Sequence, residues 1–128
     1  MIVLDTSVLI EALRRDGPAP QQLRDAIDAH QRVVLPTLVL YEWLRGPRTE
    51  AELAAQEGLF PSDETIPFGP DEARVAAELY RTVPRARGRE MDLAIAACAI
   101  SWRAKLWTRN PRDFGDVPGL ELWRAEGC

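Results

Sequence analysis

Short apolar runs alternate with longer amphipathic segments along this chain. Runs of large aliphatic or aromatic residues at 2–5, 32–36 and 105–108 are typical of strands that are buried on both faces. Between them, apolar residues recur three and four positions apart, which predicts helices. Because strands that alternate with helices pair in parallel through right-handed crossovers, we expect an α/β fold, a three-layer α/β/α sandwich with a central, mainly parallel sheet.

Capping and turn residues set the limits of these segments. Helices are predicted at 7–15, 20–30, 37–46, 49–58, 70–83 and 90–104, and two further short strands at 65–68 and 120–123. Ser7 and Thr37 are predicted N-caps, because a hydroxyl oxygen accepts a hydrogen bond from a first-turn N–H group. The segment 90–104 is apolar on all sides, so we expect this helix to lie inside the molecule.

Composition favours one unit that functions away from membranes. The 128 residues suit one domain spanning 1–128, and no apolar run is long enough for a bilayer. Cys98 and Cys128 are scattered and suggest neither a disulfide framework nor a zinc site. The cytoplasm is therefore the expected compartment. The net charge of −4 argues against broad binding of duplex nucleic acid, which needs many basic residues.

Four acidic residues stand close to the predicted ends of strands or the starts of helices. Asp5 ends the first apolar run, Glu42 lies in the helix after the second, and Asp92 opens the apolar helix. Asp113, with Asn110 nearby, follows the last of the three runs. The carboxyl ends of parallel strands form one edge of a sheet, where ligands bind, so we expect these side chains to meet there.

Each of these residues also has an ordinary structural explanation. Asp5 has the side chain of a helix cap, Glu42 could lie on an exposed helix face, and Asp92 could interact with the helix dipole. Asn110 and Asp113 are typical of turns that contain proline and glycine. Four separate explanations would all have to hold, whereas one shared site accounts for all four acids.

A shared site of carboxylates favours a hard metal ion. Clustered carboxylates repel one another unless a cation or protons neutralise them. Oxygen ligands suit Mg²⁺ or Mn²⁺, which keep several waters and bind phosphate oxygens. Zinc is a poor candidate, because His30 is the only histidine and the cysteines are scattered. Hydrolysis of a phosphodiester is the reaction that such a site favours.

Four sequence blocks, taken in order, resemble those of a known family. The matching blocks are MIVLDTSVLIEAL, LPTLVLYEWLRG, MDLAIAACAI and KLWTRNPRDF. They are similar to the blocks of the PIN-domain nucleases, and specifically of the VapC-type toxins of bacterial toxin–antitoxin pairs. The resemblance runs from Ile2 to about Leu122. One block alone is common, but the order and separation of all four are distinctive.

The resemblance implies a catalytic and metal-binding set of acids and a supporting set of polar residues. The acids are Asp5, Glu42, Asp92 and Asp113. The supporting residues are Thr6, Ser7, Thr108 and Asn110. Many PIN domains have an aspartate two residues after the threonine, where this chain has Asn110, and Asp113 follows three residues later. The sequence leaves open whether Asn110 or Asp113 supports the metal, and whether one ion binds or two.

The resemblance also implies an RNA substrate, cut internally by Mg²⁺- or Mn²⁺-dependent hydrolysis, a cognate VapB-like antitoxin and a homodimer. All basic residues except Lys105 are arginine, whose planar guanidinium grips phosphate at two points. The RNA-binding candidates near the acids are Arg85, Arg87, Arg89, Arg109 and Arg112. Each of them could equally be a solvated loop residue or the partner of an acid.

Two other functional classes stay open. A catalytically silent PIN-like module would bind RNA or protein without cutting, although the presence of Asp5, Glu42 and Asp92 counts against this. A metal-dependent phosphatase of another α/β family would use Asp5 as a covalent nucleophile. That reaction needs a second acid two residues later, where Ser7 stands. An endoribonuclease toxin is therefore the favoured interpretation.

Overall fold

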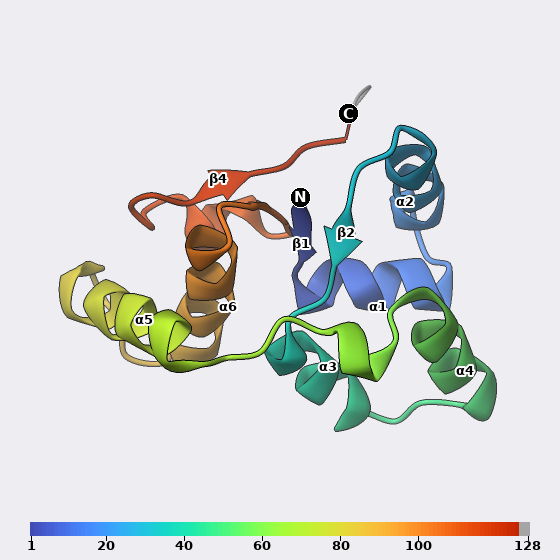
Figure 1. The fold of residues 1–128 in the computed structure, drawn as a ribbon, viewed down its shortest axis with the longest axis horizontal. Helices are drawn as coiled ribbons and strands as arrows, with labels where there is room; N and C mark the ends of the chain where they lie inside the picture. The colour runs from blue at the N-terminus through green and yellow to red at the C-terminus, as the bar shows by residue number, and fades with distance from the viewer. Residues whose placement is uncertain (126–128) are drawn as a thin grey trace.

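The computed structural model describes residues 1–125, so Cys128 lies outside the described residues (Figure 1). Its elements are, in chain order, β1 (Ile2–Leu4), α1 (Thr6–Arg14), α2 (Ala19–Asp28), β2 (Val33–Val34), α3 (Thr37–Leu44), α4 (Glu50–Leu59), the 3₁₀ turn η1 (Ser62–Glu64), α5 (Pro70–Thr82), α6 (Glu90–Ser101), β3 (Lys105–Trp107), the 3₁₀ turn η2 (Pro111–Phe114) and β4 (Glu121–Leu122). The order of strands and helices follows the alternation expected from the sequence.

The four strands form one parallel sheet in the order β2–β1–β3–β4. In this register Ile2 pairs with Val33 on one side and with Lys105 on the other. Helices α5 and α6 lie on one side of β1, and α1 and α2 lie on the other (Figure 1). The predicted three-layer α/β/α sandwich with a central parallel sheet is confirmed.

The hydrophobic core lies on both faces of the central strand. Ile2, Val3 and Leu4 are all buried, since strands flank β1 at both edges and helices cover it. Helix α6 is buried along most of its length, as expected from its apolar sequence, and its many alanines allow close packing. Neither α6 nor any other helix within residues 1–125 has the length and hydrophobicity needed to cross a bilayer.

The cap of α1 differs from the prediction. Asp5, not Ser7, is the N-cap residue, and its side chain accepts the backbone N–H of Thr6. The Ser7 hydroxyl lies within the helix and donates to Asp5 Oδ2 at 3.0 Å. The prediction of a Ser7 cap was therefore wrong, because three capping side chains in a row leave the start of a helix ambiguous by one or two residues.

The start of α3 and the strand at 65–68 also differ from the prediction. Pro36 precedes α3, and Thr37 is its first residue rather than its cap. The Thr37 hydroxyl contacts the carbonyl oxygen of Ile66 at 3.0 Å instead. The expected strand is reduced to one bridge, between Pro36 and Ile66. The bridge uses the carbonyl oxygen of Leu35 and the N–H of Thr37, and α3 begins at Thr37, so the chain leaves the extended conformation before a longer ladder can form.

Candidate active site

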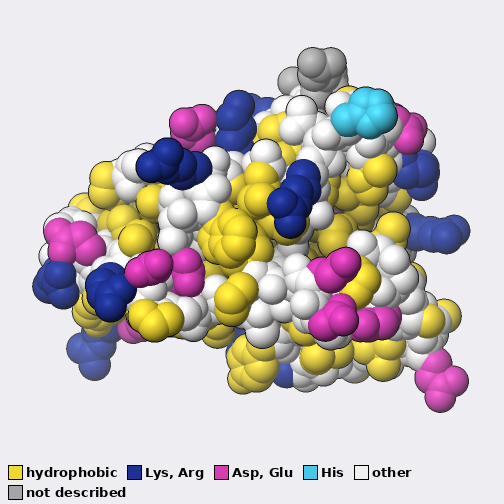
Figure 2. Space-filling model, in the orientation of Figure 1, with side chains coloured by type: hydrophobic (Ala, Val, Ile, Leu, Met, Phe, Trp, Pro, Cys, Tyr) yellow, Lys and Arg dark blue, Asp and Glu magenta, His cyan; other side chains and the backbone are white. Residues whose placement is uncertain are grey.

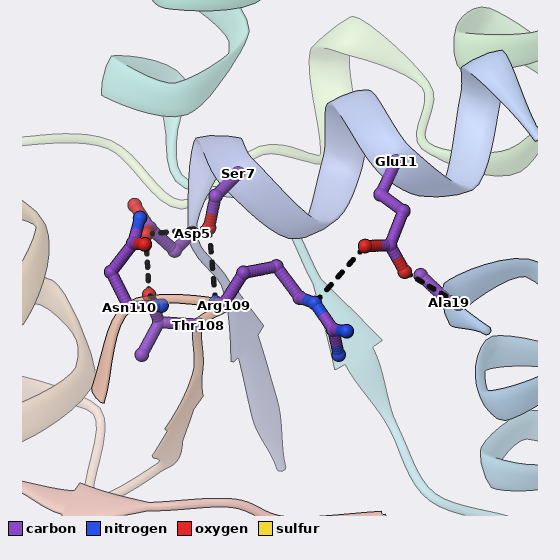
Figure 3. A network of polar contacts seen from close by, with 7 residues as sticks. All are labelled: Asp5, Ser7, Glu11, Ala19, Thr108, Arg109 and Asn110. Carbon is purple, nitrogen blue, oxygen red and sulfur yellow. Dashed lines mark hydrogen bonds and ion pairs between the residues drawn. The ribbon is translucent and has the colours of Figure 1, made fainter. Parts of the chain in front are cut away.

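Asp5 lies where β1 ends, and three hydrogen bonds hold its carboxylate. Oδ1 accepts the N–H of Thr6 at 2.9 Å. Oδ2 accepts the hydroxyls of Ser7 at 3.0 Å and Thr108 at 2.7 Å (Figure 3). These donors offset the cost of burying the charge, since Asp5 is only 6% exposed. A carboxylate has about four lone-pair positions, so one position remains for a further ligand.

The parallel register of β1 and β3 brings together the residues that follow the two strands. Leu4 pairs with Trp107, and the N–H of Asp5 donates to the carbonyl oxygen of Trp107 at 3.0 Å. Thr108 therefore emerges beside Asp5. The N–H of Asn110 donates to Thr108 Oγ1 at 3.1 Å, and the Asn110 amide points toward the Asp5 carboxylate (Figure 3).

Glu42 reaches the same place from α3. The Thr6 hydroxyl donates to Glu42 Oε1, and Arg45 forms an ion pair with Oε2 at 3.4 Å. Thr6 therefore contacts Asp5 through its backbone and Glu42 through its side chain. The Glu42 side chain is only 18% exposed, which does not fit the alternative of a residue on an open helix face.

Asp92 lies in the first turn of α6 and is partly buried. Burial is the main cause of a raised pKa for this carboxyl. The negative charges of Asp5, Glu42 and Asp113 raise the pKa of Asp92 further. The guanidinium of Arg89 partly opposes them by lowering that pKa. Charges of the same sign raise a carboxyl pKa only at short range, so these contributions indicate that the four acids lie in one region, near the ends of β1 and β3.

The donor set suits a hard divalent cation. It consists of carboxylate oxygens, and the raised pKa of Asp92 indicates negative charge that a cation would neutralise. In residues 1–125, no three His, Cys, Asp or Glu side chains are already arranged around one metal position. Mg²⁺ and Mn²⁺ accept this arrangement, because they keep several waters and need only one or two carboxylates as direct ligands.

The five arginines predicted to bind RNA fall into two groups. Arg89 is paired with Asp116 at 2.8 Å, and Arg109 with Glu11 at 3.1 Å. The other three are exposed and form no ion pair with any residue that the structure describes: Arg85, Arg87 and Arg112. A phosphate would have to displace a carboxylate at the first group but not at the second.

Sequence reasoning missed Glu11, which ties three segments together beside the acids. Its Oε1 contacts Arg109 Nε at 3.1 Å, and its Oε2 accepts the N–H of Ala19 at 2.7 Å (Figure 3). The N–H of Arg109 donates to Ser7 Oγ at 3.1 Å. Helix α1, the start of α2 and the loop after β3 are therefore linked. The four-residue spacing of Ser7 and Glu11 on one helix face was the only signal in the sequence.

Comparisons with known proteins extend over almost the whole chain. The sequence pattern of the PIN domain matches residues 2–120. The chain belongs to the PIN domain family. Ribonuclease VapC19 from Mycobacterium tuberculosis is 34% identical to this PIN domain over 124 residues, which cover 94% of this chain and 98% of that protein.

Solved structures are also similar to this PIN domain. VapBC2 from Rickettsia felis, bound to a DNA fragment from its promoter, has a chain with a TM-score of 0.76 at 24% identity, covering 96% of this chain and 98% of that one. VapBC-5 from Mycobacterium tuberculosis, a member of the VapBC family of toxin–antitoxin systems, has a TM-score of 0.63 at 31% identity, covering 95% and 96%. The first likeness concerns the fold alone, and the second also extends to the sequence.

Proposed function

We propose that this PIN domain is a metal-dependent endoribonuclease and the toxin of a toxin–antitoxin pair. The observation that carries the proposal is the neighbourhood of four acids in which the pKa of Asp92 is raised by burial and by the other three charges. Identity of 34% to Ribonuclease VapC19 over 94% of the chain supports RNA as the substrate. The reaction is the hydrolysis of an internal phosphodiester bond.

In this proposal the acids hold Mg²⁺ or Mn²⁺, directly or through water. The metal-binding and catalytic residues are Asp5, Glu42, Asp92 and Asp113. The bound ion activates a water and stabilises the charge that develops on the leaving oxygen. Ser7 and Thr108 fix the Asp5 carboxylate, and Thr6 fixes Glu42, so the two acids keep their orientation when RNA enters.

Asp113 is the better candidate for the fourth acid. Its charge contributes to the raised pKa of Asp92, after those of Asp5 and Glu42, which supports a place in the same region. Asn110 instead donates its N–H to Thr108 and points its amide toward Asp5 (Figure 3). We assign to Asn110 the supporting role of orienting a ligand or a water next to Asp5, and to Asp113 the role of an acid near the metal.

The proposed partner is a VapB-like antitoxin that restrains the nuclease. Related chains occur in structures named as VapBC toxin–antitoxin systems, which supports this assignment. We further propose that residues 1–128 act as one PIN domain, that the protein forms a homodimer and that it functions in the cytoplasm. RNA would reach the acids past three exposed arginines that form no close ion pair with a described residue, which are Arg85, Arg87 and Arg112.

Cleavage of cellular RNA by purified, antitoxin-free protein tests the proposal. Cleavage with Mg²⁺ or Mn²⁺ is expected, and EDTA should abolish it. Asp92→Asn should be inactive, whereas the matched variant Asp71→Asn, which changes an exposed first-turn acid of α5, should retain full activity. RNA binding without cleavage by the folded wild type in every metal would contradict the proposal and favour a catalytically silent binding module.

A further inference from the structure

One guanidinium, that of Arg89, binds four acceptors in two separate segments. Nη1 donates to the carbonyl oxygen of Pro84 at 3.1 Å and to Asp116 Oδ2 at 3.0 Å. Nη2 donates to Asp116 Oδ1 at 2.8 Å and to the carbonyl oxygen of Asp113 at 2.8 Å. Arg89 immediately precedes α6, whereas Asp113 lies in η2 and Asp116 shortly after it. The side chain therefore joins the start of α6 to the η2 turn.

The two segments that Arg89 joins supply two of the four acids. Asp92 follows Arg89 in the first turn of α6, and Asp113 is part of η2. Phe114 anchors η2 in the hydrophobic core, since it is only 3% exposed. An apolar anchor gives little directional restraint, whereas the paired hydrogen bonds of a guanidinium and a carboxylate fix both distance and orientation.

We propose that Arg89 is a positioning residue of the acidic site. By holding Asp116 and the main-chain oxygen of Asp113 together, it fixes η2 against the start of α6, so that Asp113 and Asp92 face the same divalent cation. This inference rests on the proposed function, because it concerns the same site. It gives Arg89 a task other than holding RNA, and its 22% exposure leaves little of the side chain for a phosphate.

Substitution of Asp116 separates this role from phosphate binding, because it leaves Arg89 itself unchanged. Asp116→Asn removes the charge that pairs with Arg89 and one of the two acceptors. Arg89→Lys keeps the positive charge but loses the planar fork that reaches several acceptors at once. If Arg89 is a positioning residue, both variants should lower the affinity of the site for a divalent cation. If Arg89 held a phosphate, Asp116→Asn would free the guanidinium and leave the metal site intact.

The decisive experiment is a titration of each purified protein with Mn²⁺ alone, followed by electron paramagnetic resonance of the free ion. Both variants should bind Mn²⁺ about 10- to 100-fold more weakly than the wild type, as is usual when a residue that orients metal ligands is lost. RNA affinity, measured in EDTA, should stay at the wild-type value. Circular dichroism at the assay temperature should confirm that each variant is folded.

Glu90→Gln is the matched control. It removes one negative charge from the same turn of α6, where Glu90 accepts the N–H of Gly88 at 3.1 Å, but it leaves the Arg89 contacts in place. Mn²⁺ affinity should therefore change far less than in Asp116→Asn. If Glu90→Gln and Asp116→Asn weaken Mn²⁺ binding equally, the loss of one negative charge near the site explains the effect. That result would overturn the positioning role.

The remaining outcomes separate this inference from the proposed function. Wild-type Mn²⁺ affinity in folded Asp116→Asn and Arg89→Lys would overturn the inference alone. Loss of RNA affinity in EDTA for Arg89→Lys, with normal Mn²⁺ binding, would assign the residue to RNA instead. Failure of the wild type itself to bind Mn²⁺ and to cleave RNA would overturn the proposed function and this inference together.

Discussion

Thr108 and Asp5 are 103 positions apart in the chain, and the Thr108 hydroxyl donates a 2.7 Å hydrogen bond to Asp5 Oδ2. The contact follows from the pairing of β1 with β3, which ends at Leu4 and Trp107. One more residue on each strand brings the hydroxyl beside the carboxylate. A buried carboxylate that accepts three hydrogen bonds is fixed in orientation. A metal ligand that is held in this way presents its free oxygen lone pair to the ion in a constant direction.

Thr108→Val tests the value of this contact. Valine keeps the shape of threonine but cannot donate, so Asp5 would lose one of its three donors and Asn110 would lose the acceptor of its N–H. We expect the kcat/KM for RNA cleavage to fall about 10- to 100-fold. The measurement is cleavage of an RNA substrate over a range of Mg²⁺ concentrations.

Thr108→Ser serves as the control, because serine retains the hydroxyl. It should cleave RNA at close to the wild-type rate. If both variants lose activity equally, the methyl group and not the hydrogen bond is important. If Thr108→Val remains fully active, the Thr108 contact has no part in orienting Asp5.

The fold and the general location of the site could be predicted because they depend on local patterns. Apolar runs that end abruptly at a polar residue, as at Asp5 and Thr108, indicate buried parallel strands and also their carboxyl ends. Because the carboxyl ends of parallel strands lie at the same edge of the sheet, the residues that follow them can be placed there from the sequence alone. The same argument placed Asp113 near that edge.

The contacts that hold the site in place could not be predicted, because they join residues with no pattern between them. Arg89 meets Asp116 across 27 positions, and Arg109, which follows β3, meets Glu11 in α1 near the other end of the chain. Either arginine could equally have faced RNA, since one side chain is as long and flexible as another. Only the packed structure decides which carboxylate each guanidinium reaches.

Asp92→Asn should stabilise the fold at neutral pH in EDTA. The pKa of Asp92 is raised, chiefly by burial and then by the other acids, so the ionised form is less favourable in the folded protein than in the unfolded chain. This cost is absent at low pH, where the carboxyl is protonated in both states. It grows once the pH passes the ordinary pKa of the unfolded chain and is complete when the pH exceeds the raised pKa of the folded protein. Asparagine removes the cost, so the variant should have a higher Tm at pH 7 and a smaller advantage as the pH falls.

Thermal unfolding over a pH series, with and without Mn²⁺, checks this prediction. Mn²⁺ should raise the Tm of the wild type more than that of Asp92→Asn, because a ligand that binds only the folded state stabilises it. Asp71→Asn again provides the comparison, since this acid is exposed. A variant that is less stable than the wild type at pH 7 in EDTA would contradict the prediction, because the ionised Asp92 carboxylate would then stabilise the fold.

Thr49→Ala should lower the stability of the protein without affecting the site. Thr49 is the N-cap of α4: its hydroxyl accepts the N–H of Glu52 at 3.1 Å, and Glu52 Oε1 accepts the N–H of Thr49 at 2.8 Å. Loss of such a cap costs about 1 kcal/mol. Urea unfolding should show a lower midpoint with an unchanged slope, and Thr49→Ser should restore most of the loss.

The exposed arginines should carry the salt dependence of RNA binding. Figure 2 shows Lys and Arg side chains spread among acids on one face of the molecule, so few of them act together as a single basic surface there. Arg85→Gln, Arg87→Gln and Arg112→Gln should each reduce the slope of log K against log salt by about 0.7, the value for one lost contact to single-stranded RNA. Arg109→Gln should leave the slope unchanged, because Glu11 already occupies that guanidinium.

These slopes should be measured in the Asp92→Asn background in EDTA, so that binding is observed without cleavage. Glu11→Gln adds a sharper comparison, because it frees Arg109 without removing it. If Arg109 is held away from RNA, Glu11→Gln should steepen the slope, while Arg109→Gln leaves it unchanged. A reduced slope for Arg109→Gln equal to that for Arg112→Gln would instead mean that RNA displaces Glu11, and the ion pair would then be a contact of the free protein only.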